Sequence, residues 1–562
     1  MTFTFKSAKL NFDQESLDLI PDKTSSSEAL YVDFTSLHTD VHDRFQIFIH
    51  PKKEVILKDF ELRFSVPLTT NTSVFCNGFL PNHRSGTYQL SDKLSSRGWL
   101  AAKKNFHQQA PTFPNPRPFY SFHYGFAGTE EKGLFLGSLN ETTAFTCIEY
   151  DNQNQEVIIR KDIADLQLGH SFPLLDLLVG TGKKEAAFKN YFSAMEGTLF
   201  PPLPMTGWMA SKTGNGNSAL AIRDFLARRA EENMPADFVL IGAGYAKEAG
   251  DWLFSCDSFP EGLPAIISEI KTAGLKAGMS LSPLLCSATS DVYRQHPEWI
   301  LKDETNNPVT INTTSGNFLV LDAYDPGVQD YLQVFCYTVT TQWDVDLLKF
   351  DHLSAAFAVA RKTKTRAQAA NDFLKMLRNS CPDTIIWATD LPIAPGWLYA
   401  NYTSMASNLL ESWDTKFPML YAAPDAATAR IQLKNILQRN NYAQFGRAAN
   451  LITLAPAKDL TEAQQFTILF INALFSDVSV VVNAPDQLSA EMWGEWQAVE
   501  QWKAAEVISV HFQTEDVIII DFKNMDGKKF RGLVNLGSKE NSVDGVSLGA
   551  GETLVLGNER RS

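Results

Sequence analysis

The stretch Asp346-Leu347-Leu348-Lys349-Phe350-Asp351 decides how the central part of this chain folds. An apolar run ends there in a Lys-x-Asp triplet, within a long alternation of strand-like and helix-like segments. Strands of a parallel sheet covered on both faces read as near-continuous apolar runs, and a closed (β/α)8 barrel carries functional side chains at their C-terminal ends. We therefore expect 347–350 to be a barrel strand that delivers Asp351 to the barrel mouth.

The same alternation recurs from Thr206 onward often enough to complete a barrel. Apolar segments of strand length are separated by amphipathic segments of helix length, which favours a closed parallel barrel over an open sheet. The expected strands are 207–210, 238–241, 276–281, 347–350, 384–388, 403–406, 450–454 and 478–482. The expected helices include 218–232, 263–273, 328–341, 366–380, 426–439 and 461–475.

Segments of β character flank the barrel on both sides. The first 200 residues hold short alternating runs separated by polar turns, and Phe200-Pro201-Pro202-Leu203-Pro204 marks a stiff boundary. After a helix at about 490–503, five short strand signals follow between 507 and 556. The predicted fold is multidomain α/β and all-β, with an N-terminal β-sandwich (1–200), a central (β/α)8 TIM barrel (201–505) and a small C-terminal β-sandwich (506–562).

Composition restricts the class of protein. The 562 residues are 44% hydrophobic and 20% charged, as in an ordinary globular protein of several domains. The net charge of −14 argues against a nucleic-acid partner, and no apolar run resembles a signal peptide or a membrane span. Six scattered cysteines without CxxC spacing indicate a reducing compartment, so we expect a cytoplasmic protein. No metal cluster or dinucleotide fingerprint is visible, so no cofactor or metal is expected.

Several local motifs share one order and spacing with a known family. They are Gly207-Trp208, the stretch from Tyr245 through Gly250-Asp251-Trp252-Leu253 to Phe259-Pro260, Gly274-Leu275-Lys276-Ala277-Gly278, Ser290-Asp291-Val292 with His296-Pro297-Glu298-Trp299, Leu321-Asp322, and Lys349-Phe350-Asp351. Together they resemble the bacterial α-galactosidases of glycoside hydrolase family 36, the melibiase-like enzymes. The resemblance covers most of the chain and is clearest over 206–410. It implies a carbohydrate ligand, and it suggests a homo-oligomer formed through the β domains.

The resemblance also implies a nucleophile. A retaining glycosidase needs two carboxyl groups about 5–5.5 Å apart, one as nucleophile and one as acid and then base. The family's nucleophile is the Asp of Lys-x-Asp, which here is Asp351; otherwise this residue merely caps the loop after its strand. Lys349 points the same way by strand alternation, to contact a sugar hydroxyl or to keep the carboxylate ionised. Trp208 and Tyr245, in the matching motifs, are further candidate substrate contacts.

The family's general acid is altered in this chain. Family members carry it as the Asp of an Arg-x-x-x-Asp stretch, about 16 residues after a Pro-Leu-x-Pro-like turn that matches 392–395 here. The corresponding stretch reads Ser404-Met405-Ala406-Ser407-Asn408, so Ser404 replaces Arg and Asn408 replaces Asp. An amide has no titratable proton near neutral pH, so Asn408 can hydrogen-bond a glycosidic oxygen but cannot protonate it.

Sugar recognition is altered as well. The family ends its second barrel strand with an Asp-Asp pair that grips galactose hydroxyls, and this chain reads 240-Leu-Ile-Gly-Ala-Gly-Tyr-245 instead. Ser280 stands where the third strand would supply a Trp. The N-terminal loop Asn77-Gly78-Phe79-Leu80-Pro81-Asn82 also lacks the family's Trp. Four losses at one pocket, with the scaffold intact, indicate that selection for galactose hydrolysis was relaxed or redirected.

Other side chains are alternatives for the lost roles. Asp390, just past the fifth strand, and Glu411 are candidate replacement acids, although a turn carboxylate is the commoner outcome for such residues. His352 either tunes Asp351 or is structural. Aromatic residues after the fifth strand either stack on sugar faces or pack in the core; they are Trp387, Trp397, Tyr399 and Trp413.

Three hypotheses remain open, because fold alone does not determine function. The chain is an α-galactosidase-like pseudoenzyme that binds a glycan and hydrolyses it poorly or not at all. Alternatively, it is an active retaining glycosidase of altered specificity with a relocated acid. In the third hypothesis, it is a structural protein with a vestigial pocket. We favour the first, because the substrate carboxylates and the acid are missing together.

Overall fold

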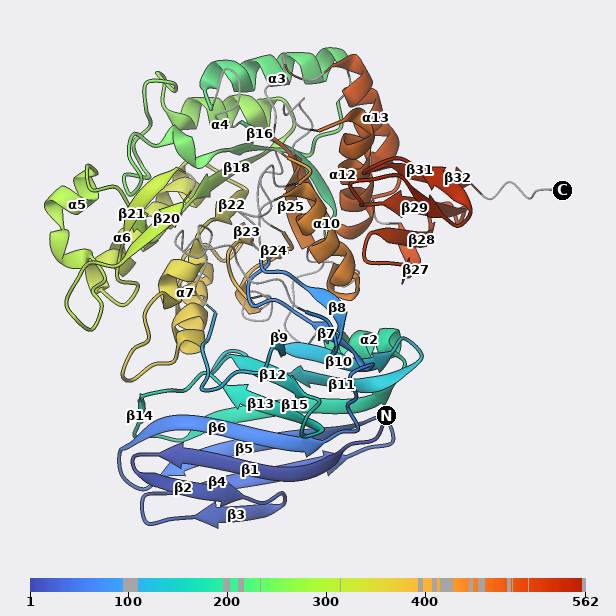
Figure 1. Cartoon of the computed structure of the whole chain (residues 1–562). Helices are drawn as coiled ribbons and strands as arrows, with labels where there is room; N and C mark the ends of the chain where they lie inside the picture. Colours follow the sequence, from blue (N-terminus) through green and yellow to red (C-terminus); the bar gives the residue numbers. More distant parts are fainter. Residues whose placement is uncertain are drawn as a thin grey trace.

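The fold is multidomain, with a closed eight-stranded barrel between two all-β parts (Figure 1). Figure 1 shows the N-terminal sheets packed under the barrel and the C-terminal sheet beside helices α12 (Glu462–Phe475) and α13 (Ala490–Glu500). The computed structural model describes residues 1–93, 110–195, 203–210, 217–232, 234–313, 315–392, 398–406, 412–414, 428–443, 448–452, 460–482, 487, 489–503 and 505–557.

Two antiparallel sheets form the N-terminal sandwich. One has the order β2-β1-β6-β13-β12-β9 with β14 also paired to β6, and the other has the order β3-β4-β5-β15-β11-β10-β7-β8. Alternating side chains of both sheets meet in a core that includes Leu10, Ile47 and Phe64. The strands are β1 (Thr4–Phe12), β2 (Glu15–Leu19), β3 (Lys23–Ser26), β4 (Leu30–His38), β5 (His42–Pro51), β6 (Val55–Ser65), β7 (Ser73–Cys76), β8 (Gly86–Gln89), β9 (Phe119–Phe122), β10 (Tyr124–Thr129), β11 (Lys132–Ser138), β12 (Thr146–Asp151), β13 (Glu156–Lys161), β14 (Leu166–Leu168) and β15 (Phe172–Gly182).

Eight parallel strands close the central barrel in sequence order, after helix α2 (Lys184–Ala194). The strands are β16 (Met205–Ala210), β17 (Phe238–Ile241), β18 (Lys276–Leu281), β22 (Leu347–Phe350), β23 (Ile385–Ala388), β24 (Tyr402–Ser404), β25 (Ala448–Ile452) and β26 (Val478–Val481). The helices between them include α3 (Ala219–Glu232), α4 (Leu263–Thr272), α6 (Pro326–Tyr337), α7 (Arg366–Ser380), α10 (Ala429–Gln438) and α12. The (β/α)8 barrel expected from the sequence is confirmed. No described helix combines the length and the apolar character that a bilayer crossing requires.

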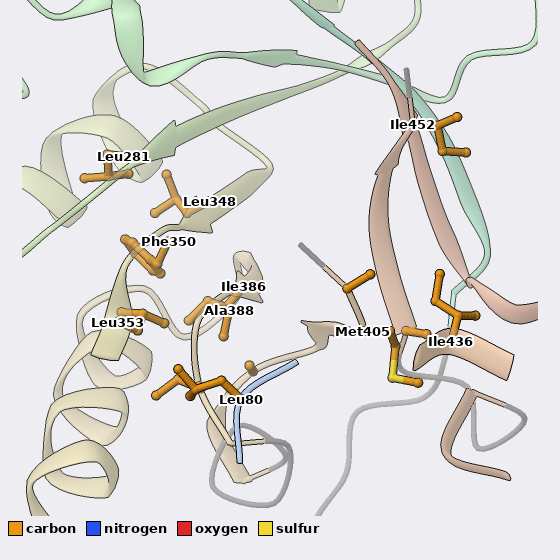
Figure 2. Close-up of a cluster of buried hydrophobic side chains, with 14 of the residues drawn as sticks. Leu80, Leu281, Leu348, Phe350, Leu353, Ile386, Ala388, Met405, Ile436 and Ile452 are labelled. Atoms are coloured by element: carbon orange, nitrogen blue, oxygen red, sulfur yellow. The ribbon is translucent and has the colours of Figure 1, made fainter. Parts of the chain in front are cut away.

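Strand alternation sorts the side chains of β22 into two sets. Leu347 lies in the barrel interior with Phe238, Leu240 and other inward-facing residues. Leu348 and Phe350 face outward into the large core between the strands and the helices, and Figure 2 shows both in that cluster. Lys349 and Asp351 therefore share the inner face with Leu347, and Asp351 is the residue that leaves the strand at its C-terminal end.

The sandwich and the barrel are joined by a buried arginine. Arg439, directly after α10, is 1% exposed and donates to the side-chain oxygen of Asn77 at 2.9 Å and to the carbonyl oxygens of Leu80 and His83 at 3.1 and 3.2 Å. It also donates to the carbonyl oxygen of Met405 at 3.2 Å, just past β24. The loop that follows β7 is thereby fixed against the barrel mouth.

Apolar contacts reinforce this junction. Phe79 packs edge-on against Phe357, with the ring centroids 6.2 Å apart. Leu80 belongs to the same buried cluster as Leu353 and Ala388, as Figure 2 shows. The loop that in the resembling family contributes to the pocket is here part of a continuous core.

A four-stranded antiparallel sheet and a hairpin make the C-terminal part. The sheet order is β27-β28-β29-β32, with β27 (Glu506–Phe512), β28 (Val517–Lys523), β29 (Lys529–Asn535) and β32 (Thr553–Gly557). The expectation of one strand at 543–548 is wrong, because Asp544 and Gly545 both have positive φ and form a tight turn between β30 (Asn541–Val543) and β31 (Val546–Leu548). Asp-Gly is the dipeptide that such two-residue hairpin turns favour.

Candidate active site

Asp351 lies at the mouth of the barrel, at the end of β22, and three side chains hold its carboxylate. Ser280 of β18 donates to one oxygen at 2.5 Å, and Thr389, just after β23, donates to the other at 2.9 Å. The ammonium group of Lys349 forms an ion pair with that second oxygen. The Asp351 side chain is 13% exposed, so it is largely desolvated yet still open to the mouth.

The same contacts decide the ionisation of Asp351. Burial alone raises the pKa of a carboxyl group. The positive charges of Lys349 and His352 and the hydrogen bonds from Lys349 and Ser280 outweigh that effect, so the pKa of Asp351 is lowered from its ordinary value. A carboxylate that stays ionised in a fixed orientation has the properties that a glycosidase nucleophile requires.

Lys349 connects Asp351 to the barrel interior. Its side chain is 1% exposed, and its ammonium nitrogen lies 5.1 Å from the centroid of the Trp387 ring, a cation–π distance. The indole nitrogen of Trp387 donates to the hydroxyl of Ser404 at 3.0 Å. Trp387 and Ser404 are both buried, so these two residues support the floor of the mouth from inside the barrel.

His352 and Asp390 follow the neighbouring strands β22 and β23 and meet on the rim of the mouth. Both have positive φ, 55° in each case, which is uncommon for residues other than glycine. The backbone N–H of His352 donates to a carboxylate oxygen of Asp390 at 3.2 Å, and the His352 ring nitrogen Nδ1 lies 2.8 Å from the Ser282 hydroxyl. Asp390 therefore has a structural task, and His352 is held beside Asp351.

Several predicted contacts lie elsewhere. Trp208 is 1% exposed and stacks on Phe225 of α3 at a centroid distance of 4.3 Å, on the outer side of β16. Tyr245 is fully buried and donates to the carbonyl oxygen of Trp252 at 3.0 Å. These placements speak against the sugar contacts that the sequence suggested for both residues.

Of the remaining candidates, two aromatic residues pack in the core and three residues are not described. Trp413 is buried, and its indole ring lies close to Gly551 of the C-terminal part. Tyr399 packs against the core between strands and helices. Three predicted residues lie outside the described part of the chain, and these are Asn408, Trp397 and Glu411.

The mouth also contains residues that the sequence did not single out. Thr389 could have been found by alternation, since it stands two residues after the inward-facing Trp387. Ser282 has the same relation to Ser280. Asn217 gave no signal, because its contact at the end of β17 is with Gly242, 25 residues away in the sequence.

Asn217 lies beside the end of the second barrel strand. Its amide nitrogen donates to the carbonyl oxygen of Gly242 at 2.5 Å, and the side chain is buried. Gly242 in turn approaches β16 closely, since its N–H donates to the carbonyl oxygen of Ala210 at 3.2 Å. The strand end that carries two carboxylates in the resembling family is closed here by backbone contacts and one amide.

Comparisons with known proteins agree with this architecture. The Melibiase family profile matches residues 244–378. α-Galactosidase 2 of Pediococcus pentosaceus is 25% identical over 266 residues, which are 41% of this chain and 36% of that protein. The match to this curated relative therefore spans about a third of the relative's length.

Solved structures share the fold over nearly the whole chain. The α-galactosidase TtGalA of Thermus thermophilus, in complex with p-nitrophenyl α-D-galactopyranoside, superposes with a TM-score of 0.66 at 17% identity and covers 92% of this chain and 98% of that one. The GH36 α-galactosidase AgaA of Geobacillus stearothermophilus gives a TM-score of 0.60 at 12% identity and covers 99% of this chain and 86% of that one.

The barrel and the flanking β parts give this chain the architecture of those α-galactosidase structures. More narrowly, residues 244–378 are similar to the Melibiase family, and the chain shares the fold of the GH36 α-galactosidases over nearly its whole length.

Proposed function

We propose that this chain binds a saccharide at the barrel mouth and keeps Asp351 as a glycosidase nucleophile, with little or no hydrolysis of ordinary α-galactosides. The carboxylate of Asp351, held by Lys349, Ser280 and Thr389, is the observation that carries the proposal. A residue that only capped a loop would not need three donors from three strands or strand ends.

The proposed weakness lies in the departure of the leaving group. In the first step Asp351 forms a bond to the anomeric carbon while the glycosidic C–O bond breaks, and the leaving oxygen takes the electron pair and needs a proton. Asn408, at the position of the family's acid, has no proton to give near neutral pH. General acid catalysis is commonly worth about 10²–10⁴-fold, so ordinary oligosaccharides lose most of their turnover.

Leaving-group dependence tests the proposal. Fluoride departs without a proton, so wild-type protein should cleave α-D-galactopyranosyl fluoride and leave melibiose or raffinose nearly untouched. With azide present, the glycosyl-enzyme should yield α-galactosyl azide, the product of retained configuration. Asp351→Asn, which keeps shape and removes the nucleophile, is the matched control and should abolish both reactions. Turnover of raffinose at ordinary enzyme rates would refute the proposal.

A relocated acid is the second candidate function, and Asp390 is the described carboxylate that favours it. Asp390 stands on the rim beside His352, one strand away from Asp351. If it protonates leaving groups, some unactivated glycoside is hydrolysed, and Asp390→Asn abolishes that hydrolysis while sparing the fluoride. The hydrogen bond to the His352 backbone makes a structural role the simpler explanation.

Two further expectations belong to the proposal. The six free cysteine thiols suit a reducing compartment, which supports a cytoplasmic location. The β parts are the proposed surfaces for any homo-oligomer. Sedimentation of the purified chain measures whether it self-associates.

A further inference from the structure

The amide of Asn217 has a fixed orientation at the mouth of the barrel. The residue is 7% exposed, and Nδ2 donates to the carbonyl oxygen of Gly242 at 2.5 Å. A carbonyl oxygen only accepts hydrogen bonds, so the amide nitrogen must face Gly242 and Oδ1 must face away from it. The hydrogen bond to Gly242 therefore fixes which atom of the Asn217 amide is the oxygen and which is the nitrogen.

Oδ1 of Asn217 is a buried acceptor that has no hydrogen-bond partner within the part of the chain that the structure describes. Leaving such a group unsatisfied costs about 1–3 kcal/mol, and native proteins keep few of them. Asn472 of α12 is a buried amide with both ends satisfied, because its Nδ2 donates to the Ile468 carbonyl oxygen at 2.8 Å and its Oδ1 accepts from Ser476 at 3.2 Å. An orphaned acceptor at a mouth is explained if a ligand supplies the missing donor.

The amide that carries this acceptor lies beside the point where a side chain at residue 242 would emerge. A Cβ atom added to Gly242 would lie 3.6 Å from Nδ2 of Asn217, and it would meet the carbonyl oxygen of Ala210 at 2.6 Å and the end of the Met209 side chain at 3.0 Å. Residue 242 continues the inward-facing series of Phe238 and Leu240. The Asn217 amide therefore occupies the inner side of the strand end, where a side chain from residue 242 would have emerged.

We propose that Oδ1 of Asn217 accepts a hydrogen bond from one hydroxyl of a neutral saccharide at the barrel mouth and thereby sets which sugar binds. This inference rests on the proposed function. A sugar hydroxyl matches the acceptor because it donates a hydrogen bond and carries no charge. An anionic ligand does not match, since it would set its oxygens against Oδ1 and near the carboxylates of Asp351 and Asp390.

Calorimetric titration with methyl α-D-glycopyranosides of galactose, glucose and mannose identifies the tightest binder for the wild type. Asn217→Ala should weaken that ligand about tenfold. One monodeoxy analogue of the ligand should bind wild type about tenfold more weakly than the parent ligand does. The same analogue and the parent ligand should bind Asn217→Ala with equal affinity. Asn472→Ala, the same change at a satisfied buried amide, should leave all affinities unchanged.

The outcomes separate the two proposals. If wild type binds a methyl glycoside and Asn217→Ala binds it equally well, the role of Asn217 is refuted and the proposed function stands. If every deoxy analogue loses affinity equally in both proteins, the assignment to a single hydroxyl is refuted. If wild type binds no glycoside of the panel, the proposed function fails and this inference falls with it. Circular dichroism checks folding, and Asn217→Ser replaces the alanine variant if that variant does not fold.

Discussion

The hydroxyl of Thr389 and a carboxylate oxygen of Asp351 lie 2.9 Å apart across the neighbouring strands β23 and β22. The strands pair Phe350 with Ala388, so Asp351 and Thr389 are the next pair beyond the last registered one. A donor on the adjacent strand fixes the carboxylate without closing the mouth. Positioning of this kind is what separates a nucleophile from a loop carboxylate.

Replacement of Thr389 by valine tests this contact. Thr389→Val keeps the shape and removes the donor, so we expect cleavage of α-galactosyl fluoride to fall about tenfold because one hydrogen bond to a charged carboxylate, about 1.5 kcal/mol, no longer orients Asp351. Thr272→Val is the matched control, since the Thr272 hydroxyl donates to Ser268 within α4, away from the mouth. Equal rates for both variants would show that Thr389 does not position Asp351.

The lowered pKa of Asp351 predicts the pH dependence of that reaction. An unperturbed Asp titrates near pH 3.9, and the contacts of Asp351 move its pKa below the ordinary value. We expect kcat/KM for the fluoride to stay level from about pH 8 to pH 5 and to fall only as Asp351 becomes protonated below roughly pH 4. An acidic limb above pH 5 would assign control to a different group.

Restoring a family carboxylate at residue 242 should not restore galactoside hydrolysis. A Cβ at Gly242 would meet the backbone oxygen of Ala210 at 2.6 Å, which cannot move without shifting β16. We expect Gly242→Asp to destabilise the fold by roughly 1–3 kcal/mol in denaturant unfolding, in the range of an overpacked site, and to leave raffinose uncleaved. Gly274→Asp, at an open turn, is a control for the substitution itself, although its φ of 78° adds some strain. Gain of raffinose hydrolysis by Gly242→Asp would contradict the prediction.

A buried charge cluster in the sandwich predicts acid sensitivity. Glu141 lies 2.6 Å from His123 Nδ1 and 3.8 Å from the ammonium group of Lys161. Burial raises the pKa of Glu141, but the charges of His123 and Lys161 outweigh it and lower the pKa to about 2.

The sign of the effect follows from that lowered pKa. An unfolded Glu titrates near 4.3, so the contribution of Glu141 is complete above this pH and is lost as the pH falls toward 2. Glu141→Gln should cost roughly 3 kcal/mol of unfolding free energy at pH 7 and should flatten the stability curve between pH 4.5 and 2. An unchanged slope in urea titrations across that window would rule out this role.

Much of the barrel was predictable because its strands are buried on both faces. Strands 238–241, 276–281 and 347–350 have the predicted bounds, since apolar runs between polar turns leave little freedom in placing them. Helix 366–380 also matches, because Thr365 and Gln368 form a capping box. The helix expected at 328–341 begins at Pro326 instead, where Asp325 caps it, and its α-helical part ends at Tyr337 before a π-helical turn continues to Gln342.

The site was predictable only where alternation along one strand decides it. The pairing of Lys349 with Asp351 follows from their spacing of two residues. Trp208 shows the limit, because its sequence neighbourhood does not say whether Gly207 or Trp208 faces inward until the packing against Phe225 is known. The position of Asn217 depends on how closely the ends of β16 and β17 approach each other, and no periodic pattern in the sequence reports that distance.

The hydrogen bonds from Arg439 to surrounding carbonyl oxygens make the N-terminal sandwich and the barrel structurally dependent on each other. A barrel produced without the N-terminal 200 residues would leave the guanidinium group of Arg439 without its hydrogen-bond acceptors in the loop after β7. It would also expose the apolar surface that the loop now covers. We expect such a fragment to aggregate or misfold rather than to behave as a smaller protein. A chimaera that exchanges the barrel with that of a relative would therefore have to transfer the loop after β7 together with the end of α10, because Arg439 connects the two.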